Sequence, residues 1–215
     1  MNYDLVIVAS GKGQRADLGY NKVFYKMKDG RSVLEHSLSL FLDDEDCKNV
    51  IVVTNEEYFN EVIDNPKIKK TSGGKERKDS VRNGLDLVTS EYVMIHDGAR
   101  PFLKKETLEE IKDRLSSCDA LCLGHMASDT IKVIEGNKIV KTLDRNSIFM
   151  AETPQAFKSD LIKESYKRCE DVLFTDDASL VESLGYKVEI LINKFENKKL
   201  TMKEDFEKLW LKKLL

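Results

Sequence analysis

A glycine loop and two basic residues follow the first apolar run of the chain. The run Asp4–Val8 is short and β-branched, and glycines at the carboxyl end of a strand let the backbone turn and bring N–H groups close to a ligand. Arg15 and Lys22 then supply positive charge. We interpret this segment as a cradle for a polyphosphate, with a solvated turn that carries charges as the alternative. The loop consists of Ala9, Ser10, Gly11, Lys12 and Gly13.

Two common phosphate-binding loops do not match this segment. The dinucleotide fingerprint needs a third glycine where the chain has Ala16, and no acidic residue closes the next apolar strand, which ends at Asn55. A Walker loop needs Gly-Lys-Ser/Thr after four intervening residues, which the Gly-Lys-Gly order at 11–13 does not supply. Nicotinamide binding is therefore not expected.

A second candidate site precedes a helix expected over Lys78–Val88. Gly73 and Gly74 lie just before this helix, and Ser80 lies in its first turn. Helix amino termini bind anions and polar ligand atoms. A plain turn, with Ser80 capping local backbone, is the alternative.

An acidic residue ends the apolar strand expected over Tyr92–Ile95. Asp97 is placed to meet a ribose hydroxyl or the Mg²⁺ that accompanies nucleoside triphosphates, because this hard cation prefers oxygen ligands. Pairing with Arg100 is the alternative role, and His96 is expected to be a hydrogen-bonded structural histidine. The chain shows no Ser/His/Asp, reactive-cysteine or paired-carboxylate arrangement, so cations with one carboxylate favour phosphoryl or nucleotidyl transfer.

Composition limits the partners and the location of the chain. The 215 residues fit a single domain over 1–215, and 35 basic residues nearly balance 38 acidic ones, for a net charge of −3. We therefore expect no general affinity for nucleic acid or for a membrane. Four cysteines without metal-ligand spacing, no secretory signal and no apolar run long enough to span a bilayer predict a soluble, cytoplasmic protein.

Short apolar strands alternate with amphipathic helical stretches along the chain. This alternation predicts an α/β fold with a mostly parallel, twisted sheet and helices on both faces. Ligands of such sheets bind at the carboxyl ends of the strands, so the loop at 9–22 and the segment at 96–100 are expected to share a pocket. The expected strands are Asp4–Val8, Val50–Thr54, Tyr92–Ile95, Ala120–Leu123 and Lys187–Ile192. The expected helices are Val33–Leu42, Glu56–Ile63, Lys78–Val88, Lys105–Leu115, Ser159–Arg168, Asp176–Leu184 and Lys203–Leu214.

A hairpin interrupts this order within residues 129–145. The apolar runs Thr130–Ile134 and Lys138–Val140 flank Glu135–Asn137, which is a good hairpin turn. We expect a protruding β-arm. Because a hairpin with apolar residues on both faces is unfavourable in water, we also expect homodimerisation through it.

Taken in order, these segments resemble the cytidylyltransferases that make 4-diphosphocytidyl-2-C-methyl-D-erythritol in the non-mevalonate isoprenoid route. The resemblance extends nearly from end to end of the chain and implies a Rossmann-like nucleotidyltransferase fold. Each motif is short, but chance would not give all of them in order. They lie at 9–15, 21–22, 33–37, 73–74 with Arg77, 79–81, 96–101, 129–132, 142–145, 153–155, 175–179 and 197–199.

The resemblance implies a reaction of CTP, in the presence of Mg²⁺, with 2-C-methyl-D-erythritol 4-phosphate. It implies four catalytic residues, Arg15 and Lys22 at the transition state and Arg145 and Lys199 at the sugar phosphate. In the family the arm and the strand that bears Arg145 reach into the partner's site. Substrate binding is implied for 9–13, Gly73, Gly74, Arg77, Ser80, Asp97, Gly98, Ala99 and Arg100, and for Thr130, Thr153 and Thr175 around the sugar.

Four positions depart from the usual family pattern, and two other functions stay open. Ser10 and Ala16 stand where alanine and methionine are common, and Gly98 and Lys198 stand where alanine and isoleucine are common. None of these changes removes a catalytic charge. One alternative is a ribitol-5-phosphate cytidylyltransferase with the same fold and chemistry, and another is a catalytically silent nucleotide-binding or dimerisation module.

Overall fold

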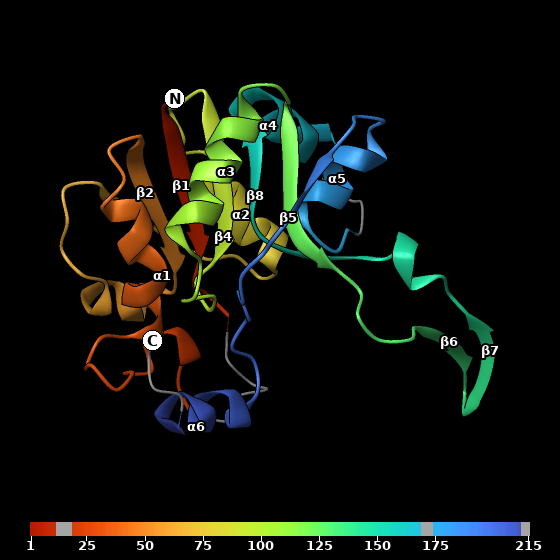
Figure 1. Cartoon of the computed structure of the whole chain (residues 1–215). Helices are drawn as coiled ribbons and strands as arrows, with labels where there is room; N and C mark the ends of the chain where they lie inside the picture. The colour runs from red at the N-terminus through yellow and green to blue at the C-terminus, as the bar shows by residue number, and fades with distance from the viewer. Residues whose placement is uncertain (12–18, 169–173, 212–215) are drawn as a thin grey trace.

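A seven-stranded sheet forms the centre of the computed structural model, which describes residues 1–11, 19–168 and 174–211 (Figure 1). The strand order is β3-β2-β1-β4-β8-β5-β9, and a separate two-stranded sheet contains β6 and β7. The strands are β1 (Tyr3–Val8), β2 (Cys47–Thr54), β3 (Ile68–Ser72), β4 (Tyr92–Asp97), β5 (Ala120–Met126), β6 (Lys132–Glu135), β7 (Lys138–Thr142), β8 (Phe149–Lys158) and β9 (Glu189–Ile192).

The predicted mostly parallel sheet is confirmed, with one exception in its middle. Strand β1 pairs in parallel with β2 and β4, and the pairs β2–β3 and β5–β9 are also parallel. Strand β8 is antiparallel to both of its neighbours, β4 and β5. The sequence did not predict β8 or the edge strand β3.

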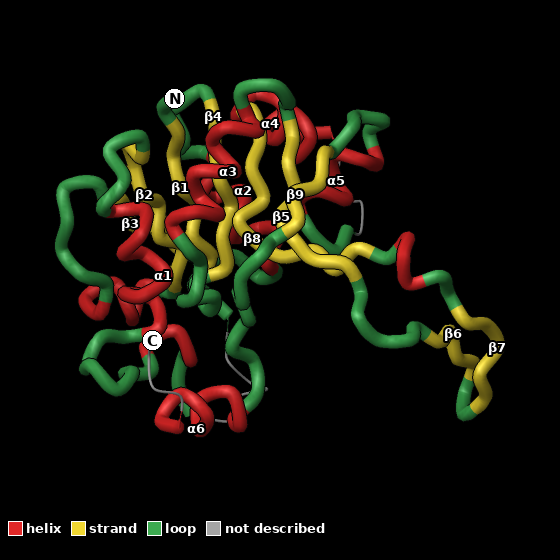
Figure 2. The backbone as a smooth tube through the Cα atoms, in the orientation of Figure 1, coloured by secondary structure: helices red, strands yellow, loops and turns green. Residues whose placement is uncertain are grey.

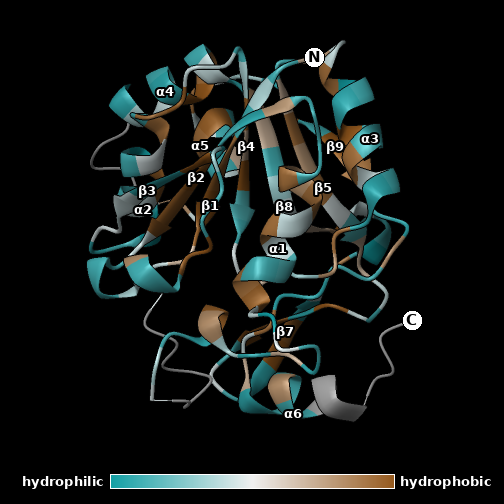
Figure 3. Cartoon of the chain, turned by 90° about the vertical axis from the view of Figure 1, so that its left-hand side faces the viewer, coloured by the Kyte–Doolittle hydropathy of each residue, from teal (hydrophilic) through white to brown (hydrophobic). Residues whose placement is uncertain are grey.

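Helices cover both faces of the sheet, as predicted (Figure 2). On one face α1 and α3 pack against side chains such as Leu5 and Val52, and on the other α2, α4 and α5 pack against Val6 and Ile51. Figure 3 shows the hydrophobic residues gathered along the central strands. The helices are α1 (Val33–Leu42), α2 (Arg77–Leu85), α3 (Lys105–Leu115), α4 (Ser159–Arg168), α5 (Asp177–Ser183) and α6 (Lys203–Leu211).

The local sequence explains where helix α1 begins. Helix α1 starts at a capping box in which Ser32 Oγ accepts from the Glu35 N–H and Glu35 accepts from the Ser32 N–H. Residues Glu56–Glu61 form a 3₁₀ helix, shorter than the predicted helix over 56–63.

Among the described residues, no helix combines the length and apolar character needed to cross a membrane.

The predicted arm protrudes from the rest of the chain (Figure 1). Strands β6 and β7 pair only with each other, and all of their residues are exposed. Gly136 in the turn has a φ of 56°, a conformation that glycine adopts without strain. Dimerisation through the arm stays a prediction.

Candidate active site

A cavity of about 590 Å³ lies where β1 and β4 end and α2 begins. The two loops that were expected to share a pocket both reach it. Its walls combine backbone from glycine-containing segments with four cationic side chains and two carboxylates, of which Asp97 is buried. They come from 8–11, 21–23 and 74–77, together with Asn55, Ser80, Asp97, Ala99 and Lys199.

Asn21 fixes the position of Lys22 in this cavity. The Asn21 amide donates to the Ala9 carbonyl, and its Oδ1 accepts from the Val23 N–H, which begins a 3₁₀ helix over Lys22–Phe24. The Asn21 N–H donates to the Tyr58 hydroxyl at 3.2 Å. Lys22 is therefore held by backbone geometry, with 9% of its surface exposed.

The loop after β1 packs closely against the start of α2. Ser10 Oγ lies 2.9 Å from Ser80 Oγ, which in turn accepts from the Gly74 N–H at 3.0 Å. A Cβ atom at position 73 would overlap the Ser10 side chain, so this close approach requires Gly73. Ser10, a departure from the usual family pattern, thus contacts the helix that was expected to bind an anion.

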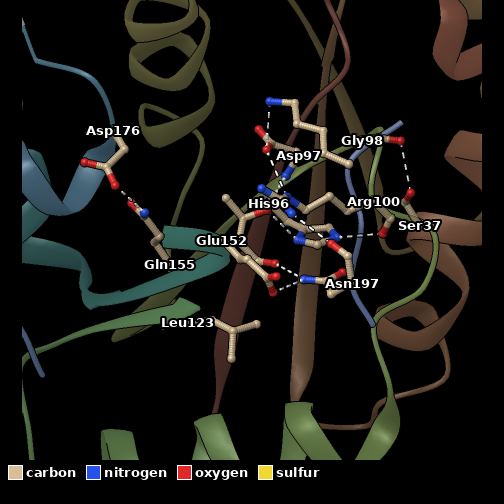
Figure 4. Close-up of polar contacts among 12 residues, drawn as sticks. Ser37, His96, Asp97, Gly98, Arg100, Leu123, Glu152, Gln155, Asp176 and Asn197 are labelled. Carbon is tan, nitrogen blue, oxygen red and sulfur yellow. Dashed lines mark hydrogen bonds and ion pairs between the residues drawn. The ribbon is translucent and has the colours of Figure 1, made fainter. Parts of the chain in front are cut away.

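Three cations surround Asp97 at the end of β4. Lys199 Nζ lies 2.9 Å from one carboxylate oxygen and Arg100 Nε 3.3 Å from the same oxygen, while Arg77 Nε lies 3.6 Å from the other. Burial opposes ionisation of this carboxyl, but the three positive charges outweigh burial and hold its pKa well below the usual range. Asp97 is therefore anionic, and its alternative role as a partner of Arg100 is also observed (Figure 4).

Asp177 holds Arg77 from the other side. Arg77 Nη2 donates to the fully buried Asp177 carboxylate at 2.8 Å, and the Tyr166 hydroxyl donates to the other Asp177 oxygen at 2.6 Å. Burial opposes the charge on Arg77, but Asp177 and Asp97 outweigh it, so the pKa of Arg77 lies above its usual range. The guanidinium is thus fixed between two carboxylates at the cavity wall.

His96 is a structural histidine, as predicted. Thr153 Oγ1 accepts from the Asp97 N–H, so its own proton is directed at His96 Nδ1, 3.0 Å away. His96 Nε2 then carries the ring proton and donates to the Arg100 carbonyl at 3.2 Å. Burial lowers the pKa of His96 to about 4, so the ring is neutral near pH 7.

The family model for 2-C-methyl-D-erythritol 4-phosphate cytidylyltransferase matches residues 4–209. The chain belongs to this family. Relatives with that name from Halalkalibacterium halodurans and Aquifex aeolicus are 38% and 39% identical to it over 215 and 207 residues. Each alignment covers 95% of this chain and 94% of the relative.

Solved structures with the same name share the fold. The enzyme from Francisella tularensis superposes with a TM-score of 0.85 at 27% identity, over 98% of this chain and 99% of that one. The enzyme from Thermus thermophilus gives a TM-score of 0.82 at 26% identity, over 97% of each chain. The arrangement of sheet and helices described above is therefore that of the cytidylyltransferase family.

The structure brings most of the predicted site residues of this cytidylyltransferase family member to one cavity. Gly73, Gly98, Arg100 and Thr153 lie directly behind its walls, where Gly98 N–H donates to the Val8 carbonyl and Thr153 supports β4. Lys12, Gly13 and Arg15 lie outside the described residues, as does Ala16. The predicted residues that line the cavity are Ala9, Ser10, Gly11, Lys22, Gly74, Arg77, Ser80, Asp97, Ala99 and Lys199.

Three further predicted residues neither line the cavity of their own chain nor support its walls. Thr130 is exposed at the base of the arm, and Arg145 donates to the Ser128 carbonyl at 2.9 Å in the same region. Thr175 is exposed just before α5. Their roles at the sugar phosphate stay predictions.

Sequence reasoning assigned no role to several residues that shape the cavity. Asn21 and Asp177 belong to the family motifs at 21–22 and 175–179, so these motifs could have pointed to them. Glu152 offered none, because the strand that carries it was not predicted. The structure joins it to Asn197, whose amide donates to a Glu152 oxygen at 3.2 Å (Figure 4).

Proposed function

We propose that this chain transfers the cytidylyl group of CTP to the phosphate of 2-C-methyl-D-erythritol 4-phosphate and releases pyrophosphate. The observation that carries the proposal is the cavity at the ends of β1 and β4, in which Arg77 and Lys199 pair with the buried, anionic Asp97 and Lys22 lines the wall. A polyanionic substrate and a reaction that develops negative charge both need such cations. We infer the two substrates from the names of the family and of the relatives.

The reaction is an in-line displacement at phosphorus. An oxygen of the sugar phosphate attacks the α-phosphorus of CTP, and the bond from that phosphorus to the oxygen bridging the α and β phosphates breaks. Pyrophosphate leaves with that oxygen and with the electron pair of the broken bond. No side chain needs to act as a nucleophile, so positioning and charge stabilisation carry the catalysis.

Individual residues have separate roles in this proposal. The loop at 9–13 and the start of α2, with Gly74 and the Ser80 hydroxyl, hold the triphosphate. Arg15 and Lys22 stabilise the charge that develops on the transferred phosphate and the leaving pyrophosphate. Asp97 lies beside the ribose, and Lys199 holds the incoming sugar phosphate.

Mg²⁺ is the metal that we propose for the loaded enzyme. In the described part of the chain no three metal-ligating side chains gather, and Asp97 already pairs with three cations. This donor set fits a Mg²⁺ ion held mainly by phosphate oxygens and water, with Asp97 as the protein carboxylate. When bound, the metal neutralises phosphate charge that the lysines and arginines do not reach.

A second copy of the chain completes the site in this proposal. Val133, Ile134, Ile139 and Val140 expose between 39% and 64% of their surfaces on the arm, which makes the arm suited to burial against a partner. Thr130 and Arg145, which lie away from the cavity of their own chain, would then enter the cavity of the partner with the sugar phosphate.

A parallel acceptor assay tests the proposed function. Pyrophosphate release from CTP and Mg²⁺ is measured with 2-C-methyl-D-erythritol 4-phosphate and, separately, with ribitol 5-phosphate. We expect release with the first acceptor and formation of 4-diphosphocytidyl-2-C-methyl-D-erythritol by mass spectrometry. A preference for ribitol 5-phosphate would reassign the acceptor, and release with neither acceptor would favour a silent module.

A further inference from the structure

Glu152 lies in a part of the central strand β8 that has no regular pairing with β4 or β5. Pairing of β8 with β4 ends at Gln155, and pairing with β5 is irregular between Cys122 and Gly124. Residues 152–154 therefore lie outside the regular ladders. This irregularity frees the Glu152 side chain and the Thr153 carbonyl to contact a segment other than a strand.

The Glu152 carboxylate is buried, with 8% exposure, and accepts three hydrogen bonds from residues that the structure describes. One oxygen accepts from the amides of Asn193 at 2.9 Å and Asn197 at 3.2 Å, and the other contacts His125 Nδ1 at 3.0 Å. No lysine or arginine among the described residues forms an ion pair with it. Two of its three partners belong to the segment 193–200.

The segment 193–200 carries Lys199 into the cavity. The Asn197 amide also donates to the Thr153 carbonyl at 2.8 Å, and the Asn197 carbonyl accepts from Arg100 Nη1 at 2.8 Å (Figure 4). The Leu200 N–H donates to the Ala99 carbonyl at 2.9 Å. Lys199 is thus bracketed by two anchored residues, with its ammonium 2.9 Å from Asp97.

We propose that Glu152 is a positioning residue that holds Lys199 at the reacting phosphates through Asn193 and Asn197. Movement of the segment would leave a buried carboxylate without its donors, which is unfavourable. Glu152 therefore restricts the position of Lys199 without touching either substrate. The kinetic part of this inference rests on the proposed function, whereas the structural part does not.

Replacement of Glu152 by leucine tests the proposal. Glu152→Leu replaces the carboxylate with a somewhat shorter apolar side chain that accepts no hydrogen bond, so Lys199 loses its fixed position. We expect the KM for the sugar phosphate to rise about tenfold or more, because small misplacements of positioning groups have large kinetic effects. The KM for CTP stays near the wild-type value, and Glu152→Gln, which retains an acceptor oxygen, restores part of the loss.

Two control variants separate positioning from general stability. Asp4 is a buried carboxylate that accepts from Asn49, Thr89 and Ser90 at the start of β1, away from the cavity. Asp4→Asn should lower the unfolding midpoint without changing either KM. His125→Ala removes the one Glu152 partner in the described chain that lies outside the segment 193–200, and should leave both KM values close to wild type.

Hydrogen exchange of the amides at 193–200 gives a readout that needs no substrate. We expect faster exchange there in Glu152→Leu and Asn197→Ala, and no change in Asp4→Asn. Glu152→Leu should add little to the kinetic effect of Asn197→Ala, because both act on one contact. Unchanged exchange, or a KM for the sugar phosphate that stays at the wild-type value, would overturn the proposal. Inactive wild-type enzyme would contradict the proposed function, and the exchange result would still decide the role of Glu152.

Discussion

His96 and Asp97 are adjacent in the sequence, but near neutral pH His96 is neutral and Asp97 is negatively charged. Burial keeps the His96 ring neutral, and its two nitrogens hold Thr153 and the Arg100 carbonyl in place. Asp97 stays anionic because Lys199, Arg77 and Arg100 surround it. The end of β4 therefore presents one negative charge to three cations, and the histidine adds no competing positive charge.

The neutral His96 predicts a loss of stability in mild acid. Between its ordinary pKa of 6.5 and its folded pKa of about 4, the unfolded chain binds a proton that the folded chain does not. The free energy of unfolding therefore decreases as the pH falls, by about 2 kcal/mol from pH 7 to pH 5. Urea unfolding at the two pH values measures this change.

His96→Asn removes the titrating group and should flatten this pH dependence. Asp97 does not add to the change between pH 7 and pH 5. Its pKa is lowered in the folded chain, so its contribution to stability is lost only below about pH 4. Equal slopes in the wild type and in His96→Asn would contradict the assignment of a neutral, buried histidine.

The loop after β1 can pack against the segment that leads into α2 only because residue 73 is a glycine. A methyl group at Gly73 would overlap Ser10, so Gly73→Ala should push apart the two segments proposed to hold the triphosphate. We expect CTP to bind about tenfold more weakly by calorimetry, because small displacements of positioning groups have large effects. Ser10→Gly in the Gly73→Ala background should restore affinity. A failure of the second change to restore it would place the defect elsewhere.

The sequence predicted elements with strong local patterns and missed two that lack them. Strand β8 contains Pro154, and a proline argues against a central strand unless it lies at an irregularity. Here the proline lies outside the regular pairs with β4 and β5. Strand β3 over Ile68–Ser72 is mostly polar and lies at the edge of the sheet, where charged residues are usual.

The candidate site was predictable where one short segment carries the chemistry. Asp97 stands out because it closely follows an apolar run, and Lys22 stands out because it is a cation that follows the glycine loop after the first strand. The pairing of Arg77 with Asp177 joins residues 100 positions apart, and Glu152 acts on a segment 41 positions further along the chain. Only the folded chain brings such partners together.

At the scale of the whole molecule, the arm predicts a site shared between two chains. Lys199 lines the cavity of its own chain, whereas Arg145 lies at the arm. Lys199→Ala and Arg145→Ala should each be inactive. After exchange of subunits, the mixture should recover about a quarter of the wild-type rate, because half of the dimers then contain one intact site.

Sedimentation at micromolar concentration supplies the physical control for this experiment. Ile134→Glu with Ile139→Glu should convert a dimer into monomers, because two charges would enter the proposed contact. A monomeric wild-type protein, or a mixture that recovers no activity despite subunit exchange, would contradict the shared site.

The effect of Lys22→Ala on turnover tests the central claim most directly, that this cavity catalyses cytidylyl transfer. One preorganised charge-stabilising group is typically worth ~3 kcal/mol, so turnover should fall by about two orders of magnitude or more. The unfolding midpoint should remain near that of the wild type, and Lys158→Ala, which removes an exposed lysine paired with Asp119, should be fully active. Undiminished turnover in a folded Lys22→Ala variant would contradict the account.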